Sequence, residues 1–229
     1  MSWKEDAKRR VALEAVKLVE DGFVVGLGSG STAAYAIEAI GRLIHEDDLN
    51  VVGVPSSSQA FLLAVRYGVP VTTLDEYPVI DLDIDGADEV DHRLDMAKGG
   101  GGALTREKVI ASAAKQVVIV ADETKLVERL GTTFKVPVEV LPFALATATS
   151  ELRKLGGKPF LRESKGKVGA VVTDNGNYIL DVDFGPIDAA ETLNWQIKLV
   201  PGVVETGLFI GLADRVFLGK KDGIVELKK

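Results

Sequence analysis

Four consecutive glycines, Gly99–Gly102, follow a lysine and precede a charged segment in the run KGGGGALTREK at 98–108. Adjacent glycines weaken helices and strands through backbone entropy, so they are expected where main chain adopts unusual dihedrals or approaches a ligand closely. Lys98 can place a cation beside carboxylates, and the glycine amides can face a developing oxyanion. Glu107, on a predicted helix that begins near Ala103, carries the functional group of a general base. The same charges also fit a solvated helix face, so it is the combination that indicates an active site.

Two further carboxylates, Asp85 and Asp88, lie in the motif DGADE at 85–89. The segment 80–85 alternates apolar and acidic residues, which predicts a strand that ends at Gly86. In open parallel sheets, ligands bind beyond the carboxyl ends of the strands, where both acids would fall. A calcium loop is excluded, because its twelfth position is His92 where glutamate is required.

A second glycine motif, GLGSGST at 26–32, joins a predicted strand to a predicted helix. Unpaired amides and the helix dipole favour an anion at such a helix start, and the residues that could cradle a phosphate are Ser29, Gly30, Ser31 and Thr32. A tight turn with a serine cap is the structural alternative. The motif lacks the third glycine of a dinucleotide fingerprint, which argues against nicotinamide binding, and it lacks the Gly-Lys-Ser/Thr ending, so it is not a Walker loop.

Composition excludes several classes of function. The 229 residues include no cysteine, which rules out disulfides, thiolate metal sites and a cysteine nucleophile. The net charge of -7 argues against a nucleic-acid-binding surface. The two histidines, His45 and His92, lie far apart in sequence, which argues against a histidine triad or zinc centre. The N-terminal decapeptide is charged and no apolar stretch could span a bilayer, so we expect a cytoplasmic location and no membrane partner.

The order of apolar and glycine-rich segments predicts an α/β fold, with a Rossmann-like, mostly parallel sheet and helices on both faces. Capping-box spacing at Ser2 and Glu5 begins a predicted helix over 2–21. A buried strand over 23–28 and a helix over 33–43 follow. Further strands of this sheet are predicted over 51–54, 69–74, 79–84 and 117–121, with an apolar helix through Val65.

After Lys125 the pattern changes to that of a smaller α+β domain of the ferredoxin-like, split βαβ type. The predicted elements are a strand over 136–141, a helix over 147–155, strands over 159–163 and within 168–183, a helix over 189–200 and a strand over 203–209. Asp174-Asn175-Gly176-Asn177 is the clearest hairpin signal. The segments 213–218 and 224–227 could pair as a terminal hairpin or return to the first sheet. We expect an α/β catalytic domain over 1–130 plus 208–229, and the smaller domain over 131–207.

With these motifs in place, the sequence resembles ribose-5-phosphate isomerase of the type A family. The resemblance rests on GLGSGSTA at 26–33, SSS at 56–58, DGADE at 85–89, KGGGGALTREK at 98–108, ADETK at 121–125, PVEV at 137–140, VVTDNGN at 171–177 and PGVVETGLF at 201–209. It implies reversible conversion of ribose 5-phosphate to ribulose 5-phosphate in the pentose phosphate pathway, without a metal or organic cofactor. It also implies a small-molecule sugar phosphate as partner and a homodimer or homotetramer.

The resemblance implies roles for individual residues. Glu107 corresponds to the general base that moves a proton between the first two sugar carbons through an enediolate. Asp85 corresponds to the acid associated with ring opening, Asp88 to a carboxylate that orients the sugar hydroxyls, and Lys98 to the cation facing the substrate oxygens. The remaining positions bind substrate: Gly99, Gly100 and Gly101 through their amides, Ser29, Gly30, Ser31 and Thr32 as the phosphate loop, and Lys125 and Lys8 as its charged partners.

Three alternatives use the same type of scaffold. Amino-sugar phosphate deaminases and transferases with a glutamate nucleophile for coenzyme A esters share related α/β folds, which fold alone cannot separate. A sugar-phosphate sensor is the non-enzymatic alternative. The 22 residues before the first strand are too few for a helix-turn-helix domain, which argues against a sensor of the DNA-binding type.

Overall fold

The computed structural model describes residues 2–164, 166 and 168–229. The described chain separates into two compact units. The first contains residues up to Ala87, Arg106–Lys125 and Leu212–Lys229, and the second contains Asp88–Thr105 and Leu126–Gly211. The segment Asp88–Thr105, which lies within the first predicted domain range, therefore groups with the second unit. The boundaries at residues 130 and 208 remain a prediction of where two independent domains divide.

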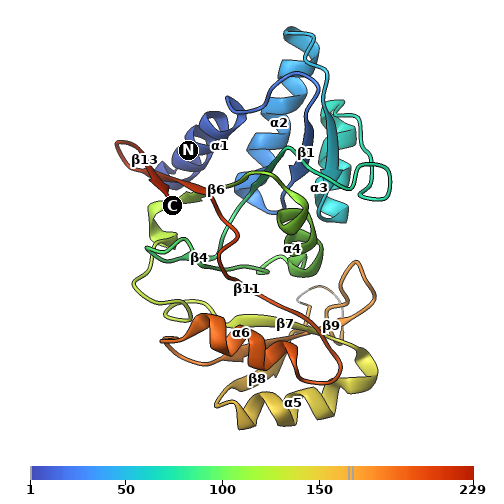
Figure 1. The fold of residues 1–229 in the computed structure, drawn as a ribbon, viewed down its shortest axis with the longest axis vertical. Helices are drawn as coiled ribbons and strands as arrows, with labels where there is room; N and C mark the ends of the chain where they lie inside the picture. Colours follow the sequence, from blue (N-terminus) through green and yellow to red (C-terminus); the bar gives the residue numbers. More distant parts are fainter. Residues whose placement is uncertain (1, 165, 167) are drawn as a thin grey trace. The chain divides into compact units, whose positions relative to one another are not determined.

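The first unit contains a six-stranded sheet with the strand order β13-β12-β6-β3-β1-β2. Figure 1 labels three of its strands, β1, β6 and β13. Its strands are β1 (Val24–Leu27), β2 (Val52–Pro55), β3 (Leu82–Asp85), β6 (Val117–Asp122), β12 (Arg215–Lys220) and β13 (Gly223–Lys228). All neighbours pair in parallel except β12 and β13, which form an antiparallel hairpin. The two alternatives for the C-terminal segments therefore both occur, because β12 pairs with β13 and also returns to the first sheet beside β6.

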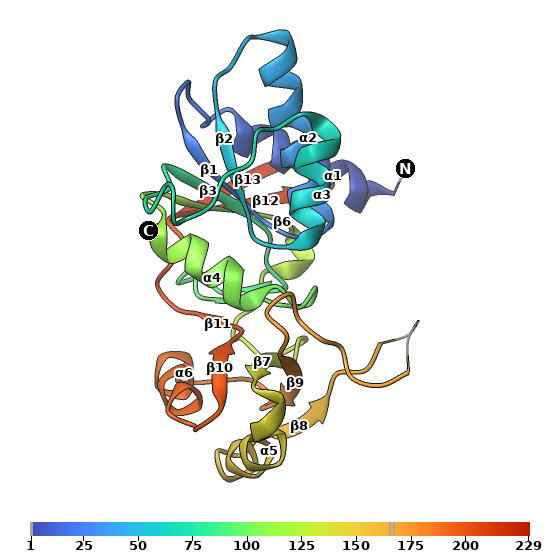
Figure 2. The same cartoon turned by 90° about the vertical axis from the view of Figure 1, so that its right-hand side faces the viewer.

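Helices cover both faces of this sheet, as predicted (Figure 2). The helices are α1 (Trp3–Val16), α2 (Ser31–Glu46), α3 (Ser58–Tyr67) and α4 (Leu104–Ala113). Val25 and Leu27 of β1 pack in one apolar cluster with α1, α2 and α3. Val24, which faces the other way because side chains alternate along a strand, packs in a second cluster with Ile110 of α4.

Two predicted elements of this unit differ in the structure. The first helix is capped by Ser2 as expected but ends at Val16, where its hydrogen bonds change to the tighter i to i−3 pattern at Leu18 and Val19. The segment 69–74 forms no strand and has a single bridge, between Val71 and Gly53. Pro70 has no amide hydrogen to donate, so it limits this segment to a short contact with the edge strand β2.

The second unit contains a four-stranded sheet with the order β10-β7-β9-β8, in which all neighbours are antiparallel. Its elements follow in the order β7 (Val136–Val140), the short 3-10 helix η2 (Pro142–Ala144), α5 (Leu145–Lys154), β8 (Lys158–Leu161), β9 (Tyr178–Asp183), α6 (Ala190–Lys198) and β10 (Val203–Thr206). This is the predicted split βαβ arrangement. One face of the sheet packs against α5 and α6 through Val136, Val138 and Val140.

The strand predicted over 203–209 is divided between two sheets. After β10, residues Leu208–Phe209 form β11, which pairs with β5 (Met96–Ala97) and, through it, with β4 (Glu89–Val90). Gly207 lies at the change of sheet, where its N–H donates to the Pro137 carbonyl at 2.6 Å and its carbonyl accepts from the Lys98 N–H at 2.9 Å. A side chain here would meet the Lys98 carbonyl oxygen at 2.4 Å, so this crossing needs glycine.

The hairpin predicted at Asp174–Asn177 is present. Gly176 has a φ of 80°, and the Thr173 N–H donates to the Asn177 carbonyl at 2.9 Å. Its first arm is limited to one antiparallel bridge, between Val172 and Tyr178. Across the described residues, no helix is both long and apolar enough to cross a membrane.

Candidate active site

The glycine loop after β1 leads directly into α2, as the sequence predicts. The N-cap of α2 is Gly30, whose φ of 96° is a conformation that favours glycine, and no side chain caps the helix there. The first amides of α2 therefore lie at the positive end of a 16-residue helix, which is an anion-binding geometry. The Gly30 N–H itself donates to the side-chain oxygen of Gln59 at 2.9 Å.

Ser29 is held by hydrogen bonds to two neighbouring segments, at the ends of β2 and β3. Its hydroxyl lies 2.8 Å from that of Ser56 and 2.6 Å from that of Ser57, and its N–H donates to Asp85 Oδ1 at 3.0 Å. Ser56 and Ser57 belong to the SSS motif, which the sequence had left without a function. In the structure they fix the loop that follows β1 to the loop that follows β2.

Lys8 lies beside the start of α2. Its ammonium donates to Ser31 Oγ at 3.1 Å and to Glu5 at 2.8 Å. The Lys8 hydrogen bond, followed by that of Tyr35, holds the pKa of Glu5 below its usual value, and Glu5 in turn raises the pKa of Tyr35. Two predicted site residues, Lys8 and Ser31, are therefore adjacent, although 23 positions separate them in sequence.

Asp85 connects the ends of β1 and β3. Its side chain is buried, and Oδ1 accepts hydrogen bonds from the Ser29 N–H at 3.0 Å and the Gly86 N–H at 2.7 Å. Gly28 lies so close that a Cβ there would be 2.2 Å from this oxygen. Asp85 thus lies directly against the loop that leads to α2.

The position of Glu107 follows from the direction of α4. The N–H of Ile80, just before β3, donates to the carbonyl of Ala113, the last residue of α4, and the Ile80 carbonyl accepts from Lys115 just after the helix. The helix therefore starts toward the opposite, carboxyl end of the strand. Ile110 lies against Gly26 in β1, and Glu107 is one turn earlier, about 4.5 Å further along the axis. Glu107 is buried, with 4% of its surface exposed. It therefore lies toward the edge of the sheet at which Asp85 ends β3.

Lys125 lies at the same edge of the sheet. It ends the short 3-10 helix η1 (Glu123–Lys125) that follows β6, and β6 is parallel to β3, which is parallel to β1. The carboxyl ends of β1, β3 and β6 thus share one edge, where Lys125 and the glycine loop follow their strands.

The other predicted residues belong to the second unit. The Gly100 N–H donates to Asp88 Oδ2 at 2.8 Å, and the Gly102 N–H donates to the Gly99 carbonyl at 3.0 Å. Gly99 and Gly102 have positive φ values of 106° and 83°, which explains the need for glycine at both. The chain passes between the units four times, and the first two passages follow Ala87 and Thr105. Asp85 and Asp88 thus flank the first passage, and Glu107 follows the second.

Lys98 precedes the glycines and is buried, with 4% of its surface exposed. Its ammonium lies 5.3 Å from the ring centroid of Phe209 in β11, a distance at which a cation is attracted to an aromatic face. The side chain of Lys98 is thereby fixed beside the loop it begins.

Arg162, which sequence reasoning missed, contacts the glycine loop. Its Nη1 donates to the carbonyls of Gly99 and Gly100 at 2.9 and 3.2 Å. Its Nε donates to Asp181 Oδ2 at 2.9 Å, and Nη2 bonds the other oxygen of Asp181. Arg162 lies within the strand predicted over 159–163, where a basic residue is ordinary, so no sequence signal marked it.

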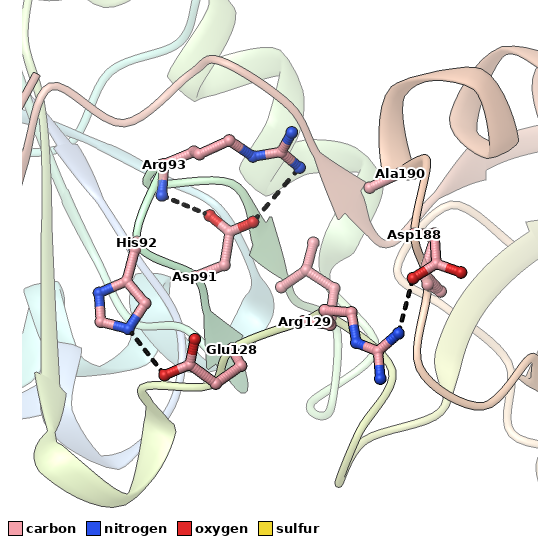
Figure 3. Close-up of a pocket in the computed structure, with 9 residues that line it drawn as sticks. Asp91, His92, Arg93, Glu128, Arg129, Asp188 and Ala190 are labelled. Atoms are coloured by element: carbon pink, nitrogen blue, oxygen red, sulfur yellow. Dashed lines mark hydrogen bonds and ion pairs between the residues drawn. The ribbon is translucent and has the colours of Figure 1, made fainter.

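Two cavities lined by described residues of the second unit are relevant to the site. One, of about 380 Å³, is lined by Gly100, Thr133, Phe134, Lys135, Arg162 and Asp181, and so adjoins the glycine loop. The other, of about 250 Å³, is shown in Figure 3 and contains none of the predicted site residues. Its arginines are both paired with acids, Arg93 with Asp91 and Arg129 with Asp188, and Glu128 contributes a further carboxylate. Acids thus outnumber arginines there, which does not suit a phosphate.

Comparison with known proteins gives one consistent result. Residues 52–223 match the family model described as Ribose 5-phosphate isomerase A (phosphoriboisomerase A). The chain is 50% identical over 214 residues to ribose-5-phosphate isomerase A of Thermosynechococcus vestitus, covering 93% of this chain and 91% of the relative. It is 46% identical over 220 residues to the Methanosarcina acetivorans protein of the same name, covering 96% and 93%.

Solved structures agree with the sequence matches. Ribose 5-phosphate isomerase A from Methanocaldococcus jannaschii superimposes with a TM-score of 0.95 at 48% identity, covering 98% of this chain and 99% of the other. A D-ribose-5-phosphate isomerase in complex with phospho-erythronic acid gives a TM-score of 0.97 at 41% identity, with complete coverage of both chains. The chain therefore belongs to the ribose 5-phosphate isomerase A family and is an isomerase.

Proposed function

We propose that this isomerase interconverts ribose 5-phosphate and ribulose 5-phosphate by proton transfer through an enediolate, with Glu107 as the general base. The observation that carries the proposal is the buried carboxylate of Glu107 on the first turn of α4, toward the sheet edge at which the helix-start anion cradle lies. Aldose–ketose exchange needs one base that reaches adjacent carbons, and it consumes no redox equivalents. The reaction belongs to the non-oxidative branch of the pentose phosphate pathway.

The phosphate group would bind at the start of α2. Helix amides, the hydroxyls of Ser31 and Thr32 and the ammonium of Lys8 supply the donors, with Lys125 as a further cation at that edge. Because the hydroxyl of Ser29 is engaged with two other serines, we assign it to shaping this loop. The solved relative bound to phospho-erythronic acid, a phosphorylated sugar acid, supports a phosphorylated sugar as the substrate.

The sugar end would be handled by the acids and the glycine loop. Asp85 assists ring opening, Asp88 orients the sugar hydroxyls and Lys98 faces the substrate oxygens. The Gly100 amide donates to Asp88, so we assign stabilisation of the enediolate oxygen to the amides of Gly99 and Gly101, with Gly100 lining the site. The proton removed from C2 is returned to C1 by Glu107, and the hydroxyl proton moves from O2 to O1, so the reaction balances without a co-reactant.

The test is Glu107→Gln, which keeps the shape of the side chain but removes its basicity. We expect kcat to fall by about 10²–10⁴-fold while ribose 5-phosphate still binds. The matched control is Glu14→Gln, a partly exposed residue of α1 whose side chain pairs with Lys17. Incubation of the parent with ribose 5-phosphate in deuterated buffer containing a chelator should give ketose with label at carbon. Near-normal turnover of Glu107→Gln would remove Glu107 from this role.

Experiments on the same purified protein distinguish the isomerase from the three alternative functions. A trapped glutamyl thioester would indicate a coenzyme A transferase, release of ammonia from an amino-sugar phosphate would indicate a deaminase, and binding without turnover would indicate a sensor. We also propose a homodimer or homotetramer in the cytoplasm, which gel filtration with light scattering and cell fractionation would test.

A further inference from the structure

The buried carboxylate of Glu139, in the motif PVEV, has no role in the chemistry proposed above. Glu139 lies on β7, and none of its surface is exposed. Because Val138 and Val140 face the helices α5 and α6, strand alternation directs Glu139 to the opposite face of the sheet. A buried carboxylate is costly unless hydrogen bonds compensate for lost hydration, so its partners indicate what it does.

Three of its hydrogen bonds come from one hairpin. Glu139 Oε1 accepts from Thr173 Oγ1 at 2.9 Å, Asn175 Nδ2 at 3.1 Å and Asn177 Nδ2 at 2.8 Å. Thr173 Oγ1 also accepts the N–H groups of Asn175 and Asn177, at 3.2 and 3.1 Å. The VVTDNGN motif thus folds into a turn whose polar side chains fix the orientation of one carboxylate.

The other oxygen of this carboxylate reaches α4. Glu139 Oε2 accepts a 2.5 Å hydrogen bond from the hydroxyl of Thr105, the second residue of the helix. Hydrogen bonds to an ionised acceptor are among the strongest in proteins, and an anion beside the first turn also complements the helix dipole. Thr105, which belongs to the second unit, is therefore attached to the sheet of that unit.

The glycine loop that precedes α4 lies over the same face of this sheet. A Cβ built on Gly99 would be 3.2 Å from Pro137 Cγ, and one built on Gly102 would be 3.1 Å from Ile179 Cδ1. Pro137 and Ile179 share the face of Glu139, since Pro137 lies two positions before it on β7 and Ile179 pairs with it on β9. The sheet thus supports the loop and the start of the helix that follows it.

Resting on the proposed function, we propose that Glu139 is a positioning residue which, through Thr105, sets the rotation of the first turn of α4 and so aims the carboxylate of Glu107. Two residues along an α-helix correspond to about 200° of rotation and 3 Å of rise. Fixing Thr105 toward the sheet therefore directs Glu107 to the opposite side of the helix. A general base must be held within about 0.5 Å of its productive position, which an unattached first turn does not provide.

The test compares Thr105→Val, which removes the hydroxyl at nearly constant volume, with Thr105→Ser, which keeps it. We expect Thr105→Val to lower kcat by about tenfold or more with KM within about twofold, because alignment changes while phosphate binding does not. It should also raise the primary isotope effect for ribose 5-phosphate deuterated at C2, since proton transfer becomes more nearly rate-limiting. Thr105→Ser should restore most of kcat, and Thr147→Val, on an exposed part of α5, is the control for the substitution itself.

The outcomes separate this inference from the proposed function. If the parent does not isomerise ribose 5-phosphate, the proposed function fails. If the parent is active and Glu107→Gln is not, but Thr105→Val has parental kcat and isotope effect with only a lower melting temperature, the positioning role is overturned. Equal losses of kcat in Thr105→Val and Thr105→Ser would also overturn it. Glu139→Gln, which keeps an acceptor for the asparagines but loses the charge, should show the same change in isotope effect.

Discussion

Replacing Gly28 with alanine should disable the site while leaving the two units folded. The backbone of Gly28 lies outside the left-handed region, so alanine can adopt its conformation without strain. The obstacle is Asp85, because an added Cβ would lie 2.2 Å from its Oδ1, 2.4 Å from its Cγ and 2.5 Å from its Cα. The clash therefore includes backbone, which no rotamer change can relieve.

The required displacement sets the size of the effect. Ordinary contact begins at 3.4 Å, so the new Cβ and the Asp85 Cα must separate by about 0.9 Å. That movement would disrupt the hydrogen bonds from Ser29 and Gly86 to Asp85, which are 3.0 and 2.7 Å long. Overpacking of this kind costs about 1–3 kcal/mol of folding free energy, and a misplacement of about 1 Å at a reacting group costs about 10²-fold in rate.

The assay is conversion of ribose 5-phosphate to ribulose 5-phosphate, with thermal unfolding followed by circular dichroism on the same samples. We expect kcat/KM of Gly28→Ala to fall by about 10²-fold, with a cooperative but lower melting transition. Gly166→Ala is the matched control, because a Cβ there meets nothing within 4 Å and its φ is not positive. If Gly28→Ala unfolds cooperatively and keeps activity within about threefold of the parent, the close packing of Asp85 against this loop is not needed for catalysis, and the reasoning fails.

Three further predictions concern charged groups away from the glycine loop of β1. Arg162→Met should lower the free energy of unfolding by about 1.5–3 kcal/mol in urea and reduce kcat. The double variant Arg162→Met/Asp181→Leu should recover part of this stability but not the rate. Additive effects of the two substitutions on stability would argue against a stabilising Arg162–Asp181 ion pair. The hydrogen bond from Lys115, then a backbone amide, lowers the pKa of Asp81 below 3.8, so the stabilisation is present above that pH and is lost as the pH falls below it. The stability difference between the parent and Asp81→Asn should therefore shrink on acidification, and a constant difference would contradict this. Burial raises the pKa of Asp95 above 3.8. As the pH rises from 3.8 through the raised pKa, the unfolded chain loses this proton more readily than the folded chain, so the stability of the fold falls. Asp95→Asn should therefore melt at a higher temperature than the parent at neutral pH, with the difference vanishing toward pH 3.8.

Local sequence patterns predicted an element correctly where one local signal, such as turn chemistry or a helix start, was enough to specify it. The hairpin at Asp174–Asn177 follows from turn chemistry, and the strand, turn and helix around Gly30 follow from glycine spacing and helix-start signals. The segment 69–74 was wrongly predicted as a strand because its apolar residues suggested one, whereas Pro70 and an edge position allow a single bridge. Apolar composition alone does not report which hydrogen bonds a segment can make.

The candidate site was predicted less completely than the fold. Glycine runs and clustered acids are expected where main chain approaches a ligand, so Asp85, Glu107 and the two glycine loops could be proposed as site residues from the sequence. Arg162 and Glu139 were not, because each is an ordinary charged residue in or beside a strand until the fold brings it to the loop before α4. Sequence also gave no reason to expect that the Gly100 amide is used by Asp88.

The order of residues by itself determined which groups can react, which backbone positions must be glycine, and which segments bury apolar faces, because these depend on side-chain chemistry and local periodicity. Tertiary structure alone decided which donors meet which acceptors across long sequence separations. Lys8 meets Ser31, Ser29 meets Ser56, and Thr105 meets Glu139 only after strands and helices pack. Hydrogen bonds act over about 3 Å, and no local pattern specifies distances of that size between segments that are remote along the chain.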